Sequence, residues 1–141
     1  MSTGDLRALL RRHEGFRSKV YKDTTGRWTL GYGRNVQDVG ITREEAGMLL
    51  ENDITRISRE LRHALPWVTK LDEVRAAALI DMAFMGVGSL LTFKRFLAAL
   101  EVGDYDTAAD EMLDSLWASQ VNGRALELAA MIRTGRYDNG A

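Results

Sequence analysis

The 141-residue sequence contains no cysteine, so neither a disulfide nor a thiolate metal site can support its fold. Its two histidines, His13 and His63, stand alone and far apart, which argues against a zinc site built from histidines. No run of about eighteen apolar residues occurs, so no membrane insertion is expected. Carboxylates, hydroxyls, amides and arginines remain as candidate chemistry, and we expect neither a metal nor a cofactor.

Length and composition indicate one folded domain. A chain of this size falls within the usual range of a single domain. Hydrophobic residues make up 45% of it and charged residues 28%, which is ordinary for a globular protein and argues against disorder. The N-terminal stretch MSTGDLRALLRRHEG is charged and amphipathic, and it lacks the apolar segment of a secretory signal.

The charge is small overall but unevenly distributed. The net charge of −1 gives no reason to expect nucleic acid as a partner. Residues 1–34 nevertheless contain eight basic side chains against three acidic ones, a balance of +5. Such a segment can steer an anionic polymer toward one face, or it can simply be a solvated basic surface. Both interpretations stay open at this point.

The N-terminal third is predicted to be one helix followed by a hairpin. Ser2 or Thr3 can cap the helix, and Gly15 is a natural end because glycine readily adopts the left-handed conformation. The stretches FRSKVYKD and RWTLGYG alternate loosely and are joined by TTG, a pattern typical of a short antiparallel hairpin. The following NVQDVG is predicted to be a loop or a third short strand.

From residue 42 onward the pattern is helical. Thr42 and Glu45 form a capping box, Pro66 ends or kinks the helix that follows, and Asp72 can cap the next one. That alanine-rich helix is apolar on most sides and is expected to be buried, with GVGS breaking it. Three further helical stretches follow, the last ending at Gly135. The predicted fold class is α+β, mostly α.

Two carboxylates in the N-terminal third stand out. Glu14 lies in the last turn of the first predicted helix, where the helix dipole disfavours the ionised form and thus favours a general acid. Asp23, in a polar turn, should stay ionised and suit a general base. Glycoside hydrolysis requires such a pair. The alternative is that Glu14 pairs with Arg17 or Lys19 on the surface and that Asp23 merely caps the turn.

The same segment resembles the active-site block of the phage-type lysozymes, the small muramidases of bacteriophage endolysins. The matching positions occur without a gap and are Glu14, Gly15, Tyr21, Asp23, Gly26, Trp28, Thr29, Leu30, Gly31 and Gly33. The resemblance continues more thinly through DEVRAAALIDMAFMGVG and SLWASQVNGRALELAAMIRTGRYD. It implies a lysozyme-like fold: a β-hairpin lobe of about residues 15–41, a helical lobe of residues 1–14 and 42–141, and a cleft between them within one domain.

The resemblance also implies roles for individual residues. Glu14 would be the general acid, Asp23 the base or charge stabiliser opposite, and Thr29 the hydroxyl that helps to hold the attacking water. Arg124 would be the basic partner near Glu14, and Phe84 with Gly86 would line the cleft and contact the substrate. Arg34 replaces a histidine common in the family, so any ion pair that it makes should persist at all pH values of interest.

The function predicted from these residues is cleavage of the β-1,4 bond between N-acetylmuramic acid and N-acetylglucosamine in peptidoglycan, by inversion. One alternative is a lytic transglycosylase, which needs the acid but no aspartate to activate water. The other is a catalytically silent module that binds saccharide or a partner. We expect a monomer made in the host cytoplasm without a signal peptide, and the resemblance implies release to the cell wall through a separate membrane-disrupting protein.

Overall fold

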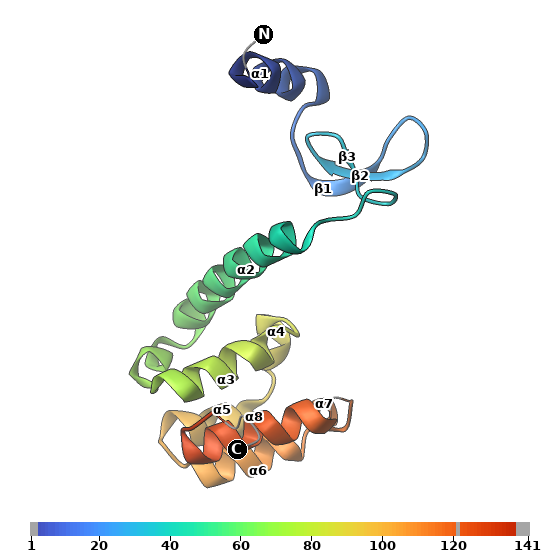
Figure 1. Cartoon of the computed structure of the whole chain (residues 1–141). Coiled ribbons are helices and arrows are strands. Elements are labelled where there is room, and N and C mark those ends of the chain that lie inside the picture. Colours follow the sequence, from blue (N-terminus) through green and yellow to red (C-terminus); the bar gives the residue numbers. More distant parts are fainter. Residues whose placement is uncertain (1–2, 121, 138–141) are drawn as a thin grey trace. The chain divides into compact units, whose positions relative to one another are not determined.

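The computed structural model describes residues 3–120 and 122–137. Two compact units, Met1–Leu50 and Glu51–Ala141, make up the chain (Figure 1). The elements of the first unit are α1 (Thr3–Glu14), β1 (Arg17–Lys22), β2 (Trp28–Gly31), β3 (Arg34–Asn35) and the start of α2 (Arg43–Ala64). The second unit contains the rest of α2, η1 (Pro66–Lys70), α3 (Glu73–Ala83), α4 (Val87–Leu90), α5 (Lys94–Glu101), α6 (Tyr105–Leu113), α7 (Leu116–Gln120) and α8 (Asn122–Thr134).

The first unit consists of α1 and a three-stranded antiparallel sheet in the order β1-β2-β3. Thr29 at the centre of β2 pairs with Tyr21 on one side and with Asn35 on the other. The predicted hairpin is therefore confirmed, and the third short strand is present as β3. α1 begins at Thr3, whereas Ser2, the other predicted cap, lies outside the described residues.

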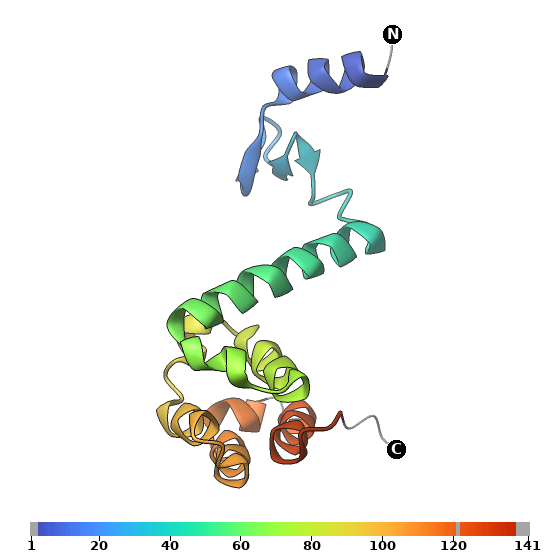
Figure 2. The same ribbon diagram turned by 90° about the vertical axis from the view of Figure 1, so that its left-hand side faces the viewer.

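Helix α2 begins at the predicted capping box and continues without interruption from the first unit into the second (Figure 2). The Glu45 amide donates to the Thr42 hydroxyl at 3.0 Å, and the Thr42 amide donates to the Glu45 carboxylate at 2.9 Å. At its other end, α2 stops at Ala64 and Pro66 opens η1, because proline has no amide hydrogen to continue the helix. Both sequence predictions for this helix are confirmed.

The core of the second unit lies among α3, α5, α6 and α8. Helices α6 and α8 lie side by side in both ribbon views, and α3 packs against α8 (Figures 1 and 2). Leu79 and Met82 of α3 are almost fully buried, and each contributes about 1.5–3 kcal/mol relative to an exposed position. Asp72 caps α3 by accepting a hydrogen bond from the Arg75 amide at 3.1 Å. The alanine-rich helix is thus the buried one, as predicted.

Arg75 ties the beginning of α3 to the end of α8. Its Nε donates to the Ile132 carbonyl at 2.6 Å, and its Nη2 donates to the Arg133 carbonyl at 3.1 Å. The guanidinium also stacks on the ring of Tyr105, 3.5 Å from its centroid. The last carbonyls of a helix have no partner within the helix, and Arg75 supplies two of them with donors. A side chain therefore stabilises the C-terminal end of α8, which Gly135 follows.

The structure is mostly helical with a small antiparallel sheet, so the predicted fold class is confirmed. Two details differ from the prediction. Within the described residues, four helices, α5 to α8, occur where three helical stretches were predicted. The break after α3 falls at residues 84–86, with Gly86 at a φ of 120°, and Val87, Gly88 and Ser89 of the predicted breaker belong to the single turn α4. Among the described residues, no helix combines the length and the apolar character needed to cross a membrane.

Candidate active site

Glu14 is the last residue of α1 and so lies in its last turn, as the sequence predicted. Gly15 follows it with a φ of 70°, and the Gly15 amide donates to the Arg11 carbonyl at 3.0 Å. A positive φ costs glycine little because it has no Cβ. The chain therefore leaves the helix directly after Glu14 and enters β1 at Arg17.

The Glu14 side chain lies against the backbone of Gly33. A Cβ at position 33 would stand 2.8 Å from Cδ of Glu14 and 3.2 Å from its Cγ, and it would meet the carboxylate oxygen Oε2 more closely still. Gly33 also has a φ of 73°, which side-chain-bearing residues rarely adopt. Two independent constraints therefore require glycine here: the backbone conformation and the space that the Glu14 carboxyl group occupies.

Asp23 sits at the start of the loop between β1 and β2, and three donors converge on one of its oxygens. Oδ1 accepts from the Thr25 amide at 2.9 Å, from the Thr25 hydroxyl at 2.7 Å and from the Arg27 amide at 3.0 Å. The Asp23 amide in turn donates to the Arg27 carbonyl at 2.9 Å. In the part of the chain that the structure describes, no hydrogen bond falls on Oδ2. Asp23 therefore has one anchored and one open oxygen.

This environment favours the ionised form of Asp23. The hydrogen bond from the Arg27 amide, followed by that from the Thr25 hydroxyl, lowers the pKa of the Asp23 carboxyl below its usual value, because each donor stabilises the charged form. The prediction that Asp23 stays ionised in a polar turn agrees with this direction.

Thr29 occupies the middle of the central strand and is only 3% exposed, the one buried polar residue among those described. Its hydroxyl donates to the Arg27 carbonyl at 2.9 Å. A hydroxyl has a single proton and two lone pairs. Because that proton is donated to the backbone, the Thr29 hydroxyl can bind a further partner only as a hydrogen-bond acceptor.

The main chain of Arg27 links the two residues predicted to handle water. Its amide holds Asp23, and its carbonyl accepts from Thr29. The Arg27 side chain pairs with Asp38 at 2.8 Å, at the turn that follows β3. Sequence reasoning missed this residue because its role belongs to backbone atoms, which carry no residue-specific signal.

The three predicted catalytic residues share one cavity. It has a volume of about 460 Å³ and is lined by Glu14, Arg17, Tyr21, Lys22, Asp23, Thr24, Thr29 and Gly33. Within the described residues, no ion pair joins Glu14 to Arg17 or Lys19, so the alternative surface pairing of this carboxylate is absent there. The turn-capping role of Asp23 is present, and it coexists with the open Oδ2.

Two cations on the wall of this cavity lie over aromatic rings. The Arg17 guanidinium is 4.3 Å from the centroid of Tyr21, and the Lys22 ammonium is 5.1 Å from that of Trp28. Such contacts hold long side chains near a ring by electrostatic attraction. The cavity therefore presents two carboxylates together with two positioned cations.

Arg34 makes an ion pair, and its partner is Glu45. Nη2 of Arg34 lies 2.6 Å from Oε2 of Glu45, and Nη1 donates to Oε1 at 2.8 Å. Glu45 is also the acidic residue of the capping box. The hydrogen bond from the Thr42 amide, followed by that from Arg34, lowers the pKa of the Glu45 carboxyl below its usual value. The sheet and the first turn of α2 are thereby joined.

The three predicted substrate-binding residues all belong to the second unit. Arg124 on α8 donates from Nε to the Asp81 carboxylate at 2.7 Å and from Nη2 to the Asp81 carbonyl at 2.8 Å. Phe84 is 41% exposed at the end of α3, and Gly86 precedes α4. The pairing of Arg124 with Glu14, and the substrate contacts of all three, stay predictions.

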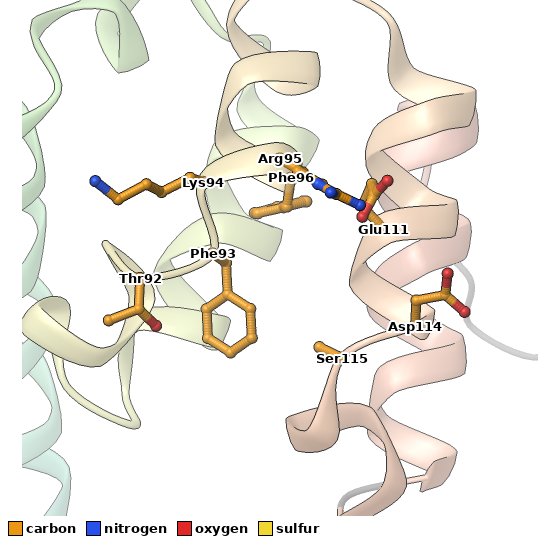
Figure 3. Close-up of a pocket in the computed structure, with 8 residues that line it drawn as sticks. All are labelled: Thr92, Phe93, Lys94, Arg95, Phe96, Glu111, Asp114 and Ser115. Atoms are coloured by element: carbon orange, nitrogen blue, oxygen red, sulfur yellow. The ribbon is translucent and has the colours of Figure 1, made fainter.

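The second unit has a hollow of its own between α5 and α6, of about 550 Å³ (Figure 3). Phe93 points into it, and Arg95 extends toward Glu111 across the gap. Phe93 also packs against the core and Trp117 is buried there, so both are core residues. The remaining members of the lining are Thr92, Lys94, Phe96, Asp114 and Ser115.

Two acidic residues of α6, Asp106 and Asp110, pair with one arginine. Nη1 of Arg133 lies 3.2 Å from Asp106, and Nη2 lies 2.8 Å from Asp110. These carboxylates are exposed, so their charges are both solvated and paired.

Comparison with known proteins decides the family. The profile of the phage lysozymes matches residues 11–134, a range that includes the whole cavity around Glu14. The chain belongs to the phage lysozyme family. It is accordingly a glycoside hydrolase, as the block around Asp23 predicted.

Relatives of this lysozyme family occur in several settings. The chain is 34% identical to the endolysin of Acyrthosiphon pisum secondary endosymbiont phage 1, over 89% of this chain and 86% of that protein. It is 31% identical to probable T4-type lysozyme 1 of Dictyostelium discoideum, over 92% and 94%. It is also 34% identical to the pre-baseplate central spike protein Gp5 of Enterobacteria phage T4, over 93% of this chain but only 28% of the spike protein.

Proposed function

We propose that this lysozyme-family protein hydrolyses peptidoglycan at the β-1,4 bond between N-acetylmuramic acid and N-acetylglucosamine, and so lyses bacterial cell walls. The observation that carries the proposal is the pair formed by Asp23 and Thr29. Both are held by the Arg27 main chain, and both line the cavity that Glu14 enters. A transglycosylase or a silent binding module has no use for a water-holding pair beside a carboxylic acid.

Each of the three side chains has one task in the proposed reaction. Glu14 donates its proton to the glycosidic oxygen as the bond from that oxygen to the anomeric carbon breaks. Water attacks the anomeric carbon from the opposite face and forms the new carbon–oxygen bond. Oδ2 of Asp23 takes one proton from the water, and Oγ1 of Thr29 accepts a hydrogen bond from its other hydrogen.

The hydrogen bonds at Thr29 and Asp23 favour direct attack by water, with inversion of the anomeric configuration. The Thr29 proton is engaged with the Arg27 carbonyl at 2.9 Å, so the hydroxyl orients a water by accepting from it. Asp23, with a lowered pKa and one open oxygen, is an available base. In a retaining enzyme the carboxylate would instead attack the sugar itself.

The remaining parts of the proposal come from the family resemblance. Phe84, Gly86 and Arg124 would contact the saccharide, and the two units would work as a single lysozyme-like domain and a monomer. Access to the wall would follow release through a separate membrane-disrupting protein. The endolysin relative supports a role in phage lysis.

Product analysis tests this function. Purified peptidoglycan is digested, the muropeptides are identified by mass spectrometry, and the fresh reducing end is observed by proton NMR before mutarotation. We expect reducing N-acetylmuramic acid ends with the inverted α configuration. A β-anomer would make Asp23 the nucleophile, and a 1,6-anhydro product would indicate a transglycosylase.

Substitution of the acid tests the same proposal from the side of the enzyme. Glu14→Gln retains size and hydrogen bonding but has no proton to donate, so wall lysis should fall by about 10²–10⁴-fold. Glu51→Gln, an exposed position on α2, is the matched control and should leave lysis unchanged. A Glu14→Gln enzyme with a tenth or more of the wild-type activity would exclude Glu14 as the acid.

A further inference from the structure

We propose that Thr25 is a positioning residue for the reaction: its hydroxyl fixes the Asp23 carboxylate so that Oδ1 is occupied and Oδ2 alone faces the water. The inference rests on the proposed function of Asp23 as the base. It assigns a role to a residue that lies outside the acid, base and hydroxyl set already described.

The geometry at Oδ1 supports this role. A carboxylate oxygen offers two lone pairs, and Oδ1 receives three donors within 3.0 Å. The shortest of the three bonds, at 2.7 Å, comes from the Thr25 hydroxyl. Oδ1 therefore has no capacity left for water. Rotation of the carboxylate to exchange its two oxygens would break all three bonds together.

The hydroxyl of Thr25 is also the only one of these donors that a substitution removes. The other two are the backbone amides of Thr25 and Arg27, which any residue except proline supplies. The loop conformation is independently held by the bonds from the Gly26 amide to the Asp23 carbonyl and from the Asp23 amide to the Arg27 carbonyl, each at 2.9 Å. Removing the hydroxyl should therefore alter the carboxylate without unfolding the loop.

The charges around Asp23 allow the contribution of Thr25 to be separated from theirs. Arg27 follows in the same loop, Arg17 and Lys22 line the cavity from β1, and Glu14 lines it from the end of α1. The cations favour the ionised form of Asp23, and Glu14 opposes it when ionised. A substitution at Thr25 leaves all four of these groups in place, so a change in the titration of Asp23 reports the lost hydrogen bond.

The test compares the pH profiles of four proteins in wall lysis. Thr25→Val removes the hydroxyl at nearly constant shape, and Thr25→Ser retains it. Thr134→Val removes a similar exposed hydroxyl that donates to a backbone carbonyl at 2.8 Å, in α8. We expect the acid limb of kcat/KM to move to higher pH in Thr25→Val, so that activity below the wild-type midpoint falls by roughly three- to tenfold. The acid limb of Thr25→Ser should lie at its wild-type position, and Thr134→Val should not move it.

A direct titration of the Asp23 carboxyl tests the role of Thr25 without relying on lytic activity. The side-chain carboxyl carbon of Asp23 is followed by NMR against pH in the wild type and in Thr25→Val, and the midpoint should rise in the variant. An unmoved midpoint together with an unmoved acid limb would overturn the role of Thr25 even if the wild type lyses walls normally. Absence of lysis by the wild type would instead overturn the proposed function. Far-UV circular dichroism establishes that each variant is folded.

Discussion

Gly33 controls the space in which the proposed acid sits. We predict that Gly33→Ala lowers both stability and lysis, because the new methyl group collides with the Glu14 carboxyl group and the backbone keeps a φ of 73°. The unfavourable φ alone costs about 1–2 kcal/mol. Thermal unfolding measures the effect on stability, and wall lysis per folded molecule measures the displacement of Glu14.

Gly40 provides the matched control for this prediction. Its φ of 69° is nearly the same, but a Cβ there would meet no atom within 4 Å. Gly40→Ala should therefore reproduce the loss of stability without the loss of lysis. If both variants lysed walls equally well, the contact between position 33 and Glu14 would have no catalytic consequence.

At the level of residues, the sequence predicted the side chains proposed for the reaction better than it predicted the backbone groups that hold them in place. Glu14, Asp23 and Thr29 were identifiable because their side chains match a family pattern, and they line one cavity. The amide and carbonyl of Arg27 were not identifiable, since every residue except proline has both groups. The close approach of Gly33 to Glu14 depends on how a helix end and a strand end meet, which local sequence does not specify.

At the level of elements, the first turn of α2 and the sheet are joined through Glu45. This carboxylate accepts from the Thr42 amide and pairs with Arg34. The pKa of Glu45 is lower in the folded protein than in the unfolded chain. Its contribution to stability is therefore fully present when the pH is above the ordinary pKa of a glutamate, and it is lost as the pH falls through the lowered pKa of the folded protein. Protonation thus removes the ion pair and weakens the cap together.

We predict that Glu45→Gln lowers the melting temperature at neutral pH and that the difference from wild type shrinks as the pH falls through the lowered pKa of Glu45, where the wild-type carboxylate also becomes neutral. Glu44→Gln is the control, since Glu44 lies in the same helical turn and the structure shows no ion pair for it among the described residues. Melting curves across pH measure both. If the difference in melting temperature between Glu45→Gln and the wild type stayed constant with pH, the cap would require the shape of the side chain and not its charge.

The local signals for element ends were largely predictable. Gly15 ends α1, Thr42 and Glu45 open α2, and Asp72 caps α3, because each acts on backbone groups within a few residues of itself. The partner of Arg34 was not predictable, since it lies eleven positions away across the turn after β3. The short α4 was not predicted because Gly86 directly before it and Gly88 within it weaken any helical pattern there.

At the level of the whole molecule, the charge asymmetry has a measurable consequence. Residues 1–34 carry a balance of +5 in a chain of net charge −1. If these charges attract anionic wall polymers, lysis of walls should slow as salt rises, because about 0.1 M salt screens exposed charges beyond roughly 10 Å. Cleavage of a short neutral chito-oligosaccharide should change far less.

Two double variants show which basic residues cause the salt dependence of wall lysis. Arg12→Gln with Lys19→Gln should flatten the salt dependence of wall lysis, whereas Arg59→Gln with Lys70→Gln removes the same charge from α2 and η1 and should not. Equal salt dependence in both double variants, or for both substrates, would leave the N-terminal basic residues as a solvated surface.

The three side chains proposed for the chemistry stand within residues 14–29, on one helix end and one hairpin. In genetic terms, the acid, the base and the water-holding hydroxyl are inherited as a single block. A crossover anywhere outside these codons passes all three to a recombinant gene together. New downstream sequence can then be acquired without the reaction being assembled again from separate parts.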